Sequence, residues 1–403
     1  MRTTTIHSPI TDIYKYYATL KFVVDNTVYD IDDTSIKTIV IDSNYDELNM
    51  PMIFITLGLY KSMANKMILN QQEGSFILDI KRCVANSDMP ELFSDYINDK
   101  FIYFIAGEVD QGVDIDIENI EADDDDTVVT LGLLSLDHVN KNKKTMNGIV
   151  NGNLSSLMYY VTGHLPIVIE PPKNNVTFEN KILPPMNSVA KTLNYLNSLS
   201  VFYPTQYRFF IDFDRSYLLS SSGKAIKASG DDITSVLITI YHIDEHEAKI
   251  QGMITNKQQA LYEIYANSAD CELSDDNISE KSFNKITANS NINGQSTSTI
   301  STGNSSLLTS KTKTVRIGNG NTGLLDNMIS SIDTSAIQLL IQKVDIDGSI
   351  FTINKEYIIR ADNAYNTEKY NGRYILVRKR ELYIRNDDTY TMNIMLLFKK
   401  VPE

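Results

Sequence analysis

The chain is poor in the side chains that perform most metal, redox and acid–base chemistry. Its 403 residues include two cysteines, Cys83 and Cys271, and five histidines. Two cysteines far apart in sequence cannot form a disulfide framework or a cysteine-rich zinc site, and five histidines leave few general bases. No Ser-His-Asp set, paired catalytic carboxylates or Walker loop can be assembled from the sequence. We therefore expect no catalytic residues, no metal site and no cofactor.

Long apolar runs are also missing. The most apolar long stretch, from Met50 to Leu69, is interrupted by lysines, asparagine, threonine and glycine, which excludes it as a membrane span. The first residues of the sequence lack the apolar core of a secretory signal peptide. We expect no membrane insertion and no export through the general secretory pathway.

Positive charge is scarce. The sequence has 37 Lys and Arg against 51 Asp and Glu, a formal net charge of -14. Affinity for nucleic acid backbones comes from clustered basic residues, so a nucleic-acid-binding surface is not expected. Residues 108–126 hold ten carboxylates and no basic residue. Three interpretations of this stretch stay open: a solvated strand edge and loop, a calcium site, or an acidic surface that repels DNA or meets a basic partner.

The opposite charge gathers late in the sequence. Residues 369–400 are net positive, with Arg378, Lys379 and Arg380 at their centre. Opposite fields on two parts of one chain favour ordered self-association over binding to a polyanion.

What is present is a pattern typical of several β-rich domains. The length suffices for two or three domains, and a hydrophobic fraction of 42% supports buried cores. Alternating apolar residues predict strands through 20–48, at 52–60 and 75–84, and again at 101–109 and 127–136. A helix is expected at 61–70 and a helical piece from Pro90 that includes Leu92, Phe93, Tyr96 and Ile97. These elements predict a first β domain over residues 1–139.

The middle of the chain predicts a small α+β domain over residues 150–232. Leu154, Leu157, Met158 and Val161 have helical spacing, and Gly163 follows them. Pro184 and Pro185 predict the start of a second helix, whose apolar stripe comprises Met186, Val189, Ala190, Leu193 and Leu196. After Ser200 the period changes to two and predicts a strand at 207–213, a turn, and a return strand at 217–219.

A second β domain is expected from residues 233–266 together with 324–403. Between these parts, residues 267–323 are crowded with Ser, Thr, Asn and Gly. Such a composition buries too little apolar surface to offset chain entropy, and it predicts a flexible polar insertion.

Three motifs resemble functional signatures. Residues 242–246 read H-x-x-E-H, a zinc-protease pattern that requires a helix, but the preceding residues are β-branched and predict a strand that ends in a hairpin turn. Asp345, Asp347 and Glu356 match part of a calcium-binding loop, although Gly348 stands at the wrong position; a hairpin turn at 347–348 explains them better. G-x-G-x-x-G at 318–323 lacks the βαβ frame of a nucleotide site.

The order of these parts resembles a known family. The central helix NSVAKTLNYLNSLSVFY, the following strand YRFFIDFDRSYLLSSSGK and the closing segment YNGRYILVRKRELYIRNDDTYTMNIMLLF stand in the order of the baseplate hub proteins of contractile-tailed phages. The hub halves of type VI secretion spikes are similar. The resemblance covers most of the chain at the level of architecture, and the long polar insertion is not part of the family core.

The resemblance implies an α+β, β-rich fold with two β-barrel-like domains that flank a small α+β domain. It also implies a structural homotrimer rather than an enzyme. Three chains with two similar barrels each present a pseudo-sixfold ring to the hexameric tail tube and a threefold face to the trimeric central spike. Other baseplate proteins are expected partners, and the location is the virion tail baseplate, assembled in the host cytoplasm. DNA only passes through the central channel.

Within this picture, the acidic residues Asp114, Asp116 and Glu118 are candidates for lining the channel, where their charge would keep DNA from adhering. Two other classes of function remain as alternatives. One is a receptor-binding or adhesive β-rich protein of the virion surface. The other is a metal-dependent hydrolase that uses His242, Glu245 and His246.

Overall fold

A computed structural model describes most of the chain. The described residues are 8–10, 14–84, 93–106, 126–203, 205–227, 233–241, 250–256, 259–267, 271–274, 283–290, 296–303, 310–317, 338–344, 348–361 and 371–401. Within them the protein is built mainly of β-strands, with four α-helices, which confirms a β-rich α+β fold.

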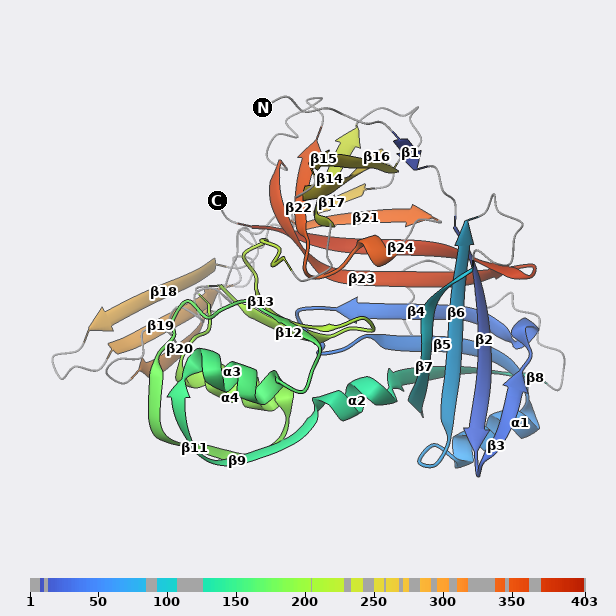
Figure 1. Cartoon of the computed structure of the whole chain (residues 1–403), viewed down its shortest axis with the longest axis horizontal. Helices are drawn as coiled ribbons and strands as arrows, with labels where there is room; N and C mark the ends of the chain where they lie inside the picture. The colour runs from blue at the N-terminus through green and yellow to red at the C-terminus, as the bar shows by residue number, and fades with distance from the viewer. Residues whose placement is uncertain are drawn as a thin grey trace.

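The elements follow one another in three groups (Figure 1). The first comprises β1 (Ser8–Ile10), β2 (Tyr14–Val24), β3 (Thr27–Ile31), the 3-10 helix η1 (Asp33–Ser35), β4 (Ile36–Asn44), β5 (Met52–Tyr60), α1 (Lys61–Leu69), β6 (Ser75–Val84), β7 (Ser94–Ile105) and β8 (Asp126–Ser135). The second comprises α2 (Leu136–Asn142), β9 (Lys143–Asn153), α3 (Leu154–Thr162), β10 (Ile167–Ile169), β11 (Thr177–Ser188), α4 (Val189–Leu199), β12 (Tyr207–Ile211) and β13 (Ser216–Ser220).

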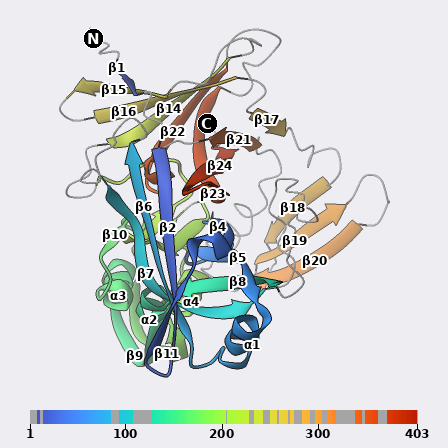
Figure 2. The same cartoon turned by 90° about the vertical axis from the view of Figure 1, so that its right-hand side faces the viewer.

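The third group is β14 (Ile233–Tyr241), β15 (Ile250–Asn256), β16 (Gln259–Asn267), β17 (Cys271–Ser274), β18 (Phe283–Ser290), β19 (Ser296–Gly303), β20 (Ser310–Ile317), β21 (Gln338–Val344), the 3-10 helix η5 (Gly348–Ile350), β22 (Glu356–Ala361), β23 (Gly372–Asn386) and β24 (Thr389–Lys400). In the stretch expected to be a flexible insertion, β18, β19 and β20 form a separate three-stranded antiparallel sheet, which stands apart from the larger sheet in Figure 2.

Strand pairing closes a circuit of eight strands. The order runs β4, β5, β8, β7, β6, β2, β24 and β23, and β23 pairs back onto β4. The contact between β2 and β24 is a single pair, Tyr16 opposite Tyr390. Six strands thus come from the first group, and the long hairpin β23–β24 supplies the other two.

The same hairpin carries a second set of strands. From β23 the pairing continues through β22, β14, β16, β15 and β1, and from β24 it continues through β21 and β17. β23 pairs with β22 at residues 372–374 and with β4 at 378–384. Its register with β24 shifts between Leu376 and Arg378. A bulge bends a strand and increases its twist, so the shift marks the place where β23 passes from one set of strands to the other.

Two hydrophobic cores follow from this arrangement. The larger is lined by alternate residues of the closed circuit, as in β2, where Tyr16, Ala18, Leu20, Phe22 and Val24 are all buried. The smaller lies in the central group, where α3 and α4 pack with residues of β12 and β13. β12 and β13 have apolar residues on both faces, so Phe209 and Ile211 belong to the smaller core while Phe210 belongs to the larger. This sheet is therefore shared between the two cores.

Two local predictions were wrong. The prolines Pro184 and Pro185 do not start the second helix; they lie in β11, and the helix begins at Val189 after Ser188, whose side chain accepts from the Lys191 N–H. Proline is tolerated there because β9 is the one strand that pairs with β11 in the described part of the chain, and because their register shifts between Leu183 and Met186, where the prolines lie. The helical piece expected from Pro90 is replaced, from Ser94 onward, by β7, because pairing with β6 buries Ile97 and Phe101.

Candidate functional site

The acidic candidates Asp114, Asp116 and Glu118 lie outside the described residues. The residues of the H-x-x-E-H motif, 242–246, and the glycine-rich run at 318–323 lie outside them as well. Within the part of the chain that the structure describes, no group of His, Cys, Asp and Glu is arranged to hold a metal ion. The described helices include none that is long and apolar enough to cross a membrane.

The structure describes one of the three residues that match a calcium-binding loop. Asp345 and Asp347 lie outside the described ranges, whereas Glu356 starts β22 and forms an ion pair with Arg373 at 2.8 Å. The hairpin predicted at 347–348 is wrong: Gly348 begins η5, and β21 and β22 pair with different strands. Of the two cysteines, Cys83 is buried, and burial raises the pKa of its thiol.

The basic residues at the centre of β23 make contacts within the chain. Arg378 donates from Nε to Asp42 Oδ1 at 2.8 Å and also binds the second oxygen of the same carboxylate. Lys379, Arg380 and Glu381 are buried, with Glu381 only 1% exposed. These charges therefore join β23 to neighbouring strands and do not form the free positive surface that the sequence suggested.

Glu381 is the centre of a buried polar cluster. Its carboxylate accepts from the Tyr96 hydroxyl of β7 and, at 3.4 Å, from the Tyr383 hydroxyl. Lys379 Nζ lies 3.4 Å from the same carboxylate and donates to the Gly348 carbonyl at 3.3 Å. Burial raises the pKa of both tyrosines well above their usual range, so both remain donors at physiological pH. The cluster fixes η5, β7 and β23 to one another.

A cavity of about 200 Å³ lies beside this cluster. Its lining comes from β4, β6, β7, the β12–β13 turn, the η5 region and β23: Ile41, Ser43, Arg82, Asp95, Tyr96, Ile97, Asp212, Phe213, Asp214, Ser349, Thr352, Lys379 and Glu381. Burial is the main cause that raises the pKa of Asp212 to about 6, while the nearby Lys379 opposes the shift. The cavity thus marks the junction of the closed circuit, the central unit and the shared hairpin.

His138 ties the central unit to the closed circuit at the same junction. It lies in α2, whose first turn is capped by the Ser135 side chain, and its ring packs 4.9 Å from that of Phe213. Burial lowers the pKa of His138 to about 4, so the imidazole is neutral at physiological pH. It is hydrogen-bonded to the backbone of Asp212. His138 is therefore a neutral, buried side chain at this junction.

Two exposed apolar surfaces lie far apart on the molecule. The α1 surface consists of Tyr60 and Leu69 at the two ends of α1, which are 72% and 83% exposed. The ribbon surface consists of Ile149 and Ile182, which face each other across β9 and β11 and are 67% and 68% exposed. Figure 1 places α1 and the β9–β11 ribbon at opposite sides of the molecule. The sequence alone did not reveal these surfaces, because an apolar residue in a strand or helix is normally expected to be buried. Only the packing of the folded chain shows that these four are exposed.

The chain belongs to a bacteriophage family. The model of the family described as Bacteriophage PBS1 gene 109 protein matches residues 6–401, which is nearly the whole sequence. No curated protein resembles the sequence closely enough to count as a match.

Solved structures are similar to the chain at low sequence identity. A tail protein from Neisseria meningitidis MC58 shares 10% identity over 95% of this chain and 96% of its own, with a TM-score of 0.45. A 43 kDa tail protein of prophage MuSo2 from Shewanella oneidensis shares 8% over 94% and 96%, with a TM-score of 0.39. The E. coli c3393 protein, a type VI secretion component described as similar to the phage T4 tail proteins gp27 and gp5, shares 8% over 92% and 74%, with a TM-score of 0.37. The match to a bacteriophage family confirms the phage origin that the resemblance of the sequence indicated.

Proposed function

We propose that this protein is a structural, non-enzymatic component of a phage tail baseplate. In this role it forms a trimeric hub ring that joins the hexameric tail tube to the trimeric central spike. The main support for this proposal is the strand pairing. One chain builds a closed circuit of eight strands, and a second set of strands pairs with the same β23–β24 hairpin. Membership of a phage family supports the setting.

The proposal rests on symmetry. A threefold assembly whose subunits carry one patch each would leave half of a sixfold tube's sites unpaired. If each chain contributes two barrel-like units, three chains present six patches to the tube and still one threefold face to the spike. The α1 surface and the ribbon surface are different patches on opposite sides of the chain, as a head-to-tail contact around a ring requires.

The proposed ring surrounds a channel for DNA. Asp114, Asp116 and Glu118 are our candidates for its lining, since carboxylates repel the phosphate backbone and release no counterions when DNA passes. Further partners in this proposal are the other baseplate proteins, and the location is the virion, after assembly in the host cytoplasm.

Mass measurement tests the proposal. We expect the purified chain to be a trimer by native mass spectrometry, and the trimer to bind the tail tube and spike proteins of the same phage. Leu69→Glu and Ile182→Glu, which place a charge in either apolar surface, should each yield folded monomers, whereas Lys191→Glu on the exposed side of α4 should remain trimeric. A chain that stays monomeric alone and with those proteins contradicts the hub. Binding of isolated chains to host cells or glycans would instead support the adhesive alternative.

A further inference from the structure

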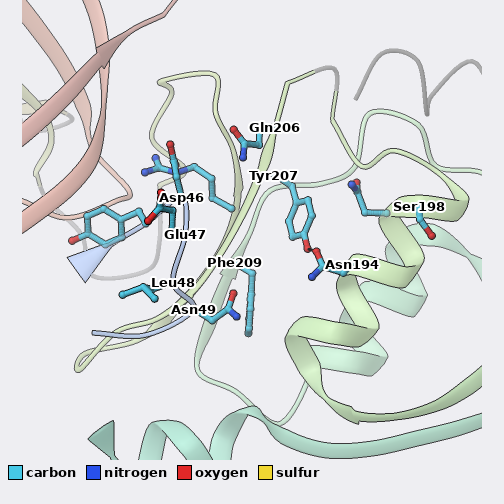
Figure 3. A pocket seen from close by; sticks show the side chains of 12 residues that line it. Asp46, Glu47, Leu48, Asn49, Asn194, Ser198, Gln206, Tyr207 and Phe209 are labelled. Atoms are coloured by element: carbon cyan, nitrogen blue, oxygen red, sulfur yellow. Dashed lines mark hydrogen bonds and ion pairs between the residues drawn. The ribbon is translucent and has the colours of Figure 1, made fainter. Parts of the chain in front are cut away.

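A polar groove lies beside the free edge of β12 (Figure 3). Its volume is about 380 Å³, within the range of sites that hold a small ligand or a short peptide segment. Three segments line it: the loop after β4, the C-terminal half of α4, and the start of β12. The lining residues are Tyr45, Asp46, Glu47, Leu48, Asn49, Asn194, Asn197, Ser198, Gln206, Tyr207, Arg208 and Phe209. In Figure 3, Asn194 and Ser198 on α4 lie on one side of β12, and Asp46 and Glu47 lie on the other.

The edge of β12 offers backbone hydrogen-bonding groups to this groove. β12 is the last strand of the sheet β10–β13–β12, and β13 is its one strand partner among the described residues. In an antiparallel pair, alternate residues direct their N–H and C=O groups away from the partner strand. Ile211 shows which residues these are, because its N–H donates to the Asn49 carbonyl at 2.8 Å on the side away from β13. By the same alternation, Tyr207 and Phe209 also turn outward.

The opposite edge of the pair confirms this alternation. Leu218 lies across from Phe209, and its carbonyl accepts from the Glu170 N–H at 2.9 Å, on the side of β13 that faces away from β12. Ser220, across from Tyr207, donates its N–H to the Glu170 carboxylate at 2.7 Å. Phe209 therefore directs its N–H and C=O toward the groove, where no strand of the described part of the chain pairs with them. An unpaired edge of this kind is a template for another strand.

The side chains around the edge define what would fit. Amides and a hydroxyl predominate at the rim, where Asn49, Asn194 and Ser198 are exposed. Of the charged lining residues, Asp46 and Arg208 neutralise each other through a contact of 2.9 Å. Glu47 accepts from the neutral Asn44 amide at 2.9 Å, and no ion pair compensates its negative charge within the described residues. The groove is suited to small polar side chains and to a basic residue rather than an acidic one.

We propose that this groove binds an extended peptide segment of a partner protein, which pairs with Tyr207 and Phe209 as an added strand of the β10–β13–β12 sheet. Main-chain hydrogen bonds would supply affinity, and the amides with Glu47 would select small polar and basic side chains. This site does not depend on the trimeric ring proposed above, and a chain that proved to be monomeric would still have it.

A peptide with the stated chemistry is the probe. The octapeptide TKSRTVKS, which combines basic, hydroxyl and apolar residues and does not occur in this chain, can be labelled and its binding to the full-length chain measured by fluorescence anisotropy. We expect saturable binding that weakens at least tenfold for the acidic counterpart TESETVES. Ser198→Trp, which fills the groove from an exposed position, should weaken binding at least tenfold, while Lys191→Trp, exposed on the same helix but outside the lining, should not.

Backbone methylation separates strand pairing from charge attraction alone. A peptide methylated at every second backbone nitrogen loses its hydrogen bonds to β12 in one register and keeps them in the other. One methylated series should therefore bind at least tenfold more weakly than the other. Equal binding of both series, equal binding of basic and acidic peptides, or no binding of TKSRTVKS would overturn the proposal. If the chain self-associates, if Ser198→Trp abolishes that association, and if no peptide binds, then the groove binds a second copy of the chain. That result would overturn the assignment to a partner protein.

Discussion

The buried cluster around Glu381 makes Gly348→Ala a sharp test of the junction. A Cβ atom at Gly348 would lie 1.9 Å from Glu381 Oε1, 3.0 Å from Glu381 Cδ and 2.8 Å from the Tyr96 hydroxyl. Such distances cannot persist, so either η5 or the carboxylate must move. The carboxylate is buried and bound to Tyr96, Tyr383 and Lys379, so any movement away from the new methyl group weakens one of these contacts.

The cost can be estimated from the bonds that the carboxylate makes. Losing one hydrogen bond to a charged group costs about 1.5–3 kcal/mol, and overpacking a tight site costs about 1–3 kcal/mol. We therefore expect Gly348→Ala to lower the free energy of unfolding by about 2.5–6 kcal/mol. Gly58→Ala is the matched control, because its new methyl would meet only the flexible end of the Lys37 side chain, at 2.9 Å from Cε. That variant should change stability by less than about 1 kcal/mol.

Urea unfolding followed by far-UV circular dichroism measures both variants. A double-mutant cycle with Glu381→Ala adds a second test: once the carboxylate is absent, Gly348→Ala should cost at least about 2 kcal/mol less than in the wild type. The reasoning is refuted if Gly348→Ala is as stable as Gly58→Ala, or if its cost is unchanged when Glu381 is alanine.

Three further predictions follow from ionisable groups. The pKa of Asp212 is raised to about 6, so the folded chain binds this proton more tightly than the unfolded chain does. The free energy of unfolding should therefore fall as pH rises from 4 to 6. Thermal unfolding at pH 7 should show Asp212→Asn to be more stable than the wild type by at most about 3 kcal/mol. The lowered pKa of His138, about 4, acts in the opposite sense: stability should fall as pH drops from 6.5 to 4, and His138→Gln should flatten that part of the profile. Reversing Asp114, Asp116 and Glu118 to lysine should leave baseplate assembly intact but slow DNA ejection in a single-particle assay; unchanged ejection would count against a channel position.

Strands were the most predictable part of the fold. Period-two alternation in residues 52–60 and 75–84 predicted β5 and β6 to within a residue, because each of these strands buries one face. Helical spacing likewise predicted α3 and the body of α4. The prolines before α4 misled because their local preference also suits a strand edge, and only the pairing of β11 with β9 decides between the two.

What the sequence could not show was which distant segments pair. The separation of β23 and β24 from β4 and β2 along the chain leaves no local signal that they complete one circuit. The same limit applies to charge: Arg378, Lys379 and Arg380 suggest a basic surface until Asp42 and Glu381 are seen beside them. The groove on β12 was also missed, since whether a strand is an edge depends on the whole sheet.

The position of the β23–β24 hairpin has a consequence for biosynthesis. The six strands β2 and β4–β8 leave the ribosome long before the two that complete their circuit, since everything from Leu136 to Asn371 is translated in between. Until then the nascent chain has unpaired strand edges and an apolar core that β23 and β24 do not yet cover. Such a state is prone to aggregation. Late closure of this kind also gives a chain with high contact order, which folds slowly. Newly made subunits should therefore depend on chaperones until translation has passed β24.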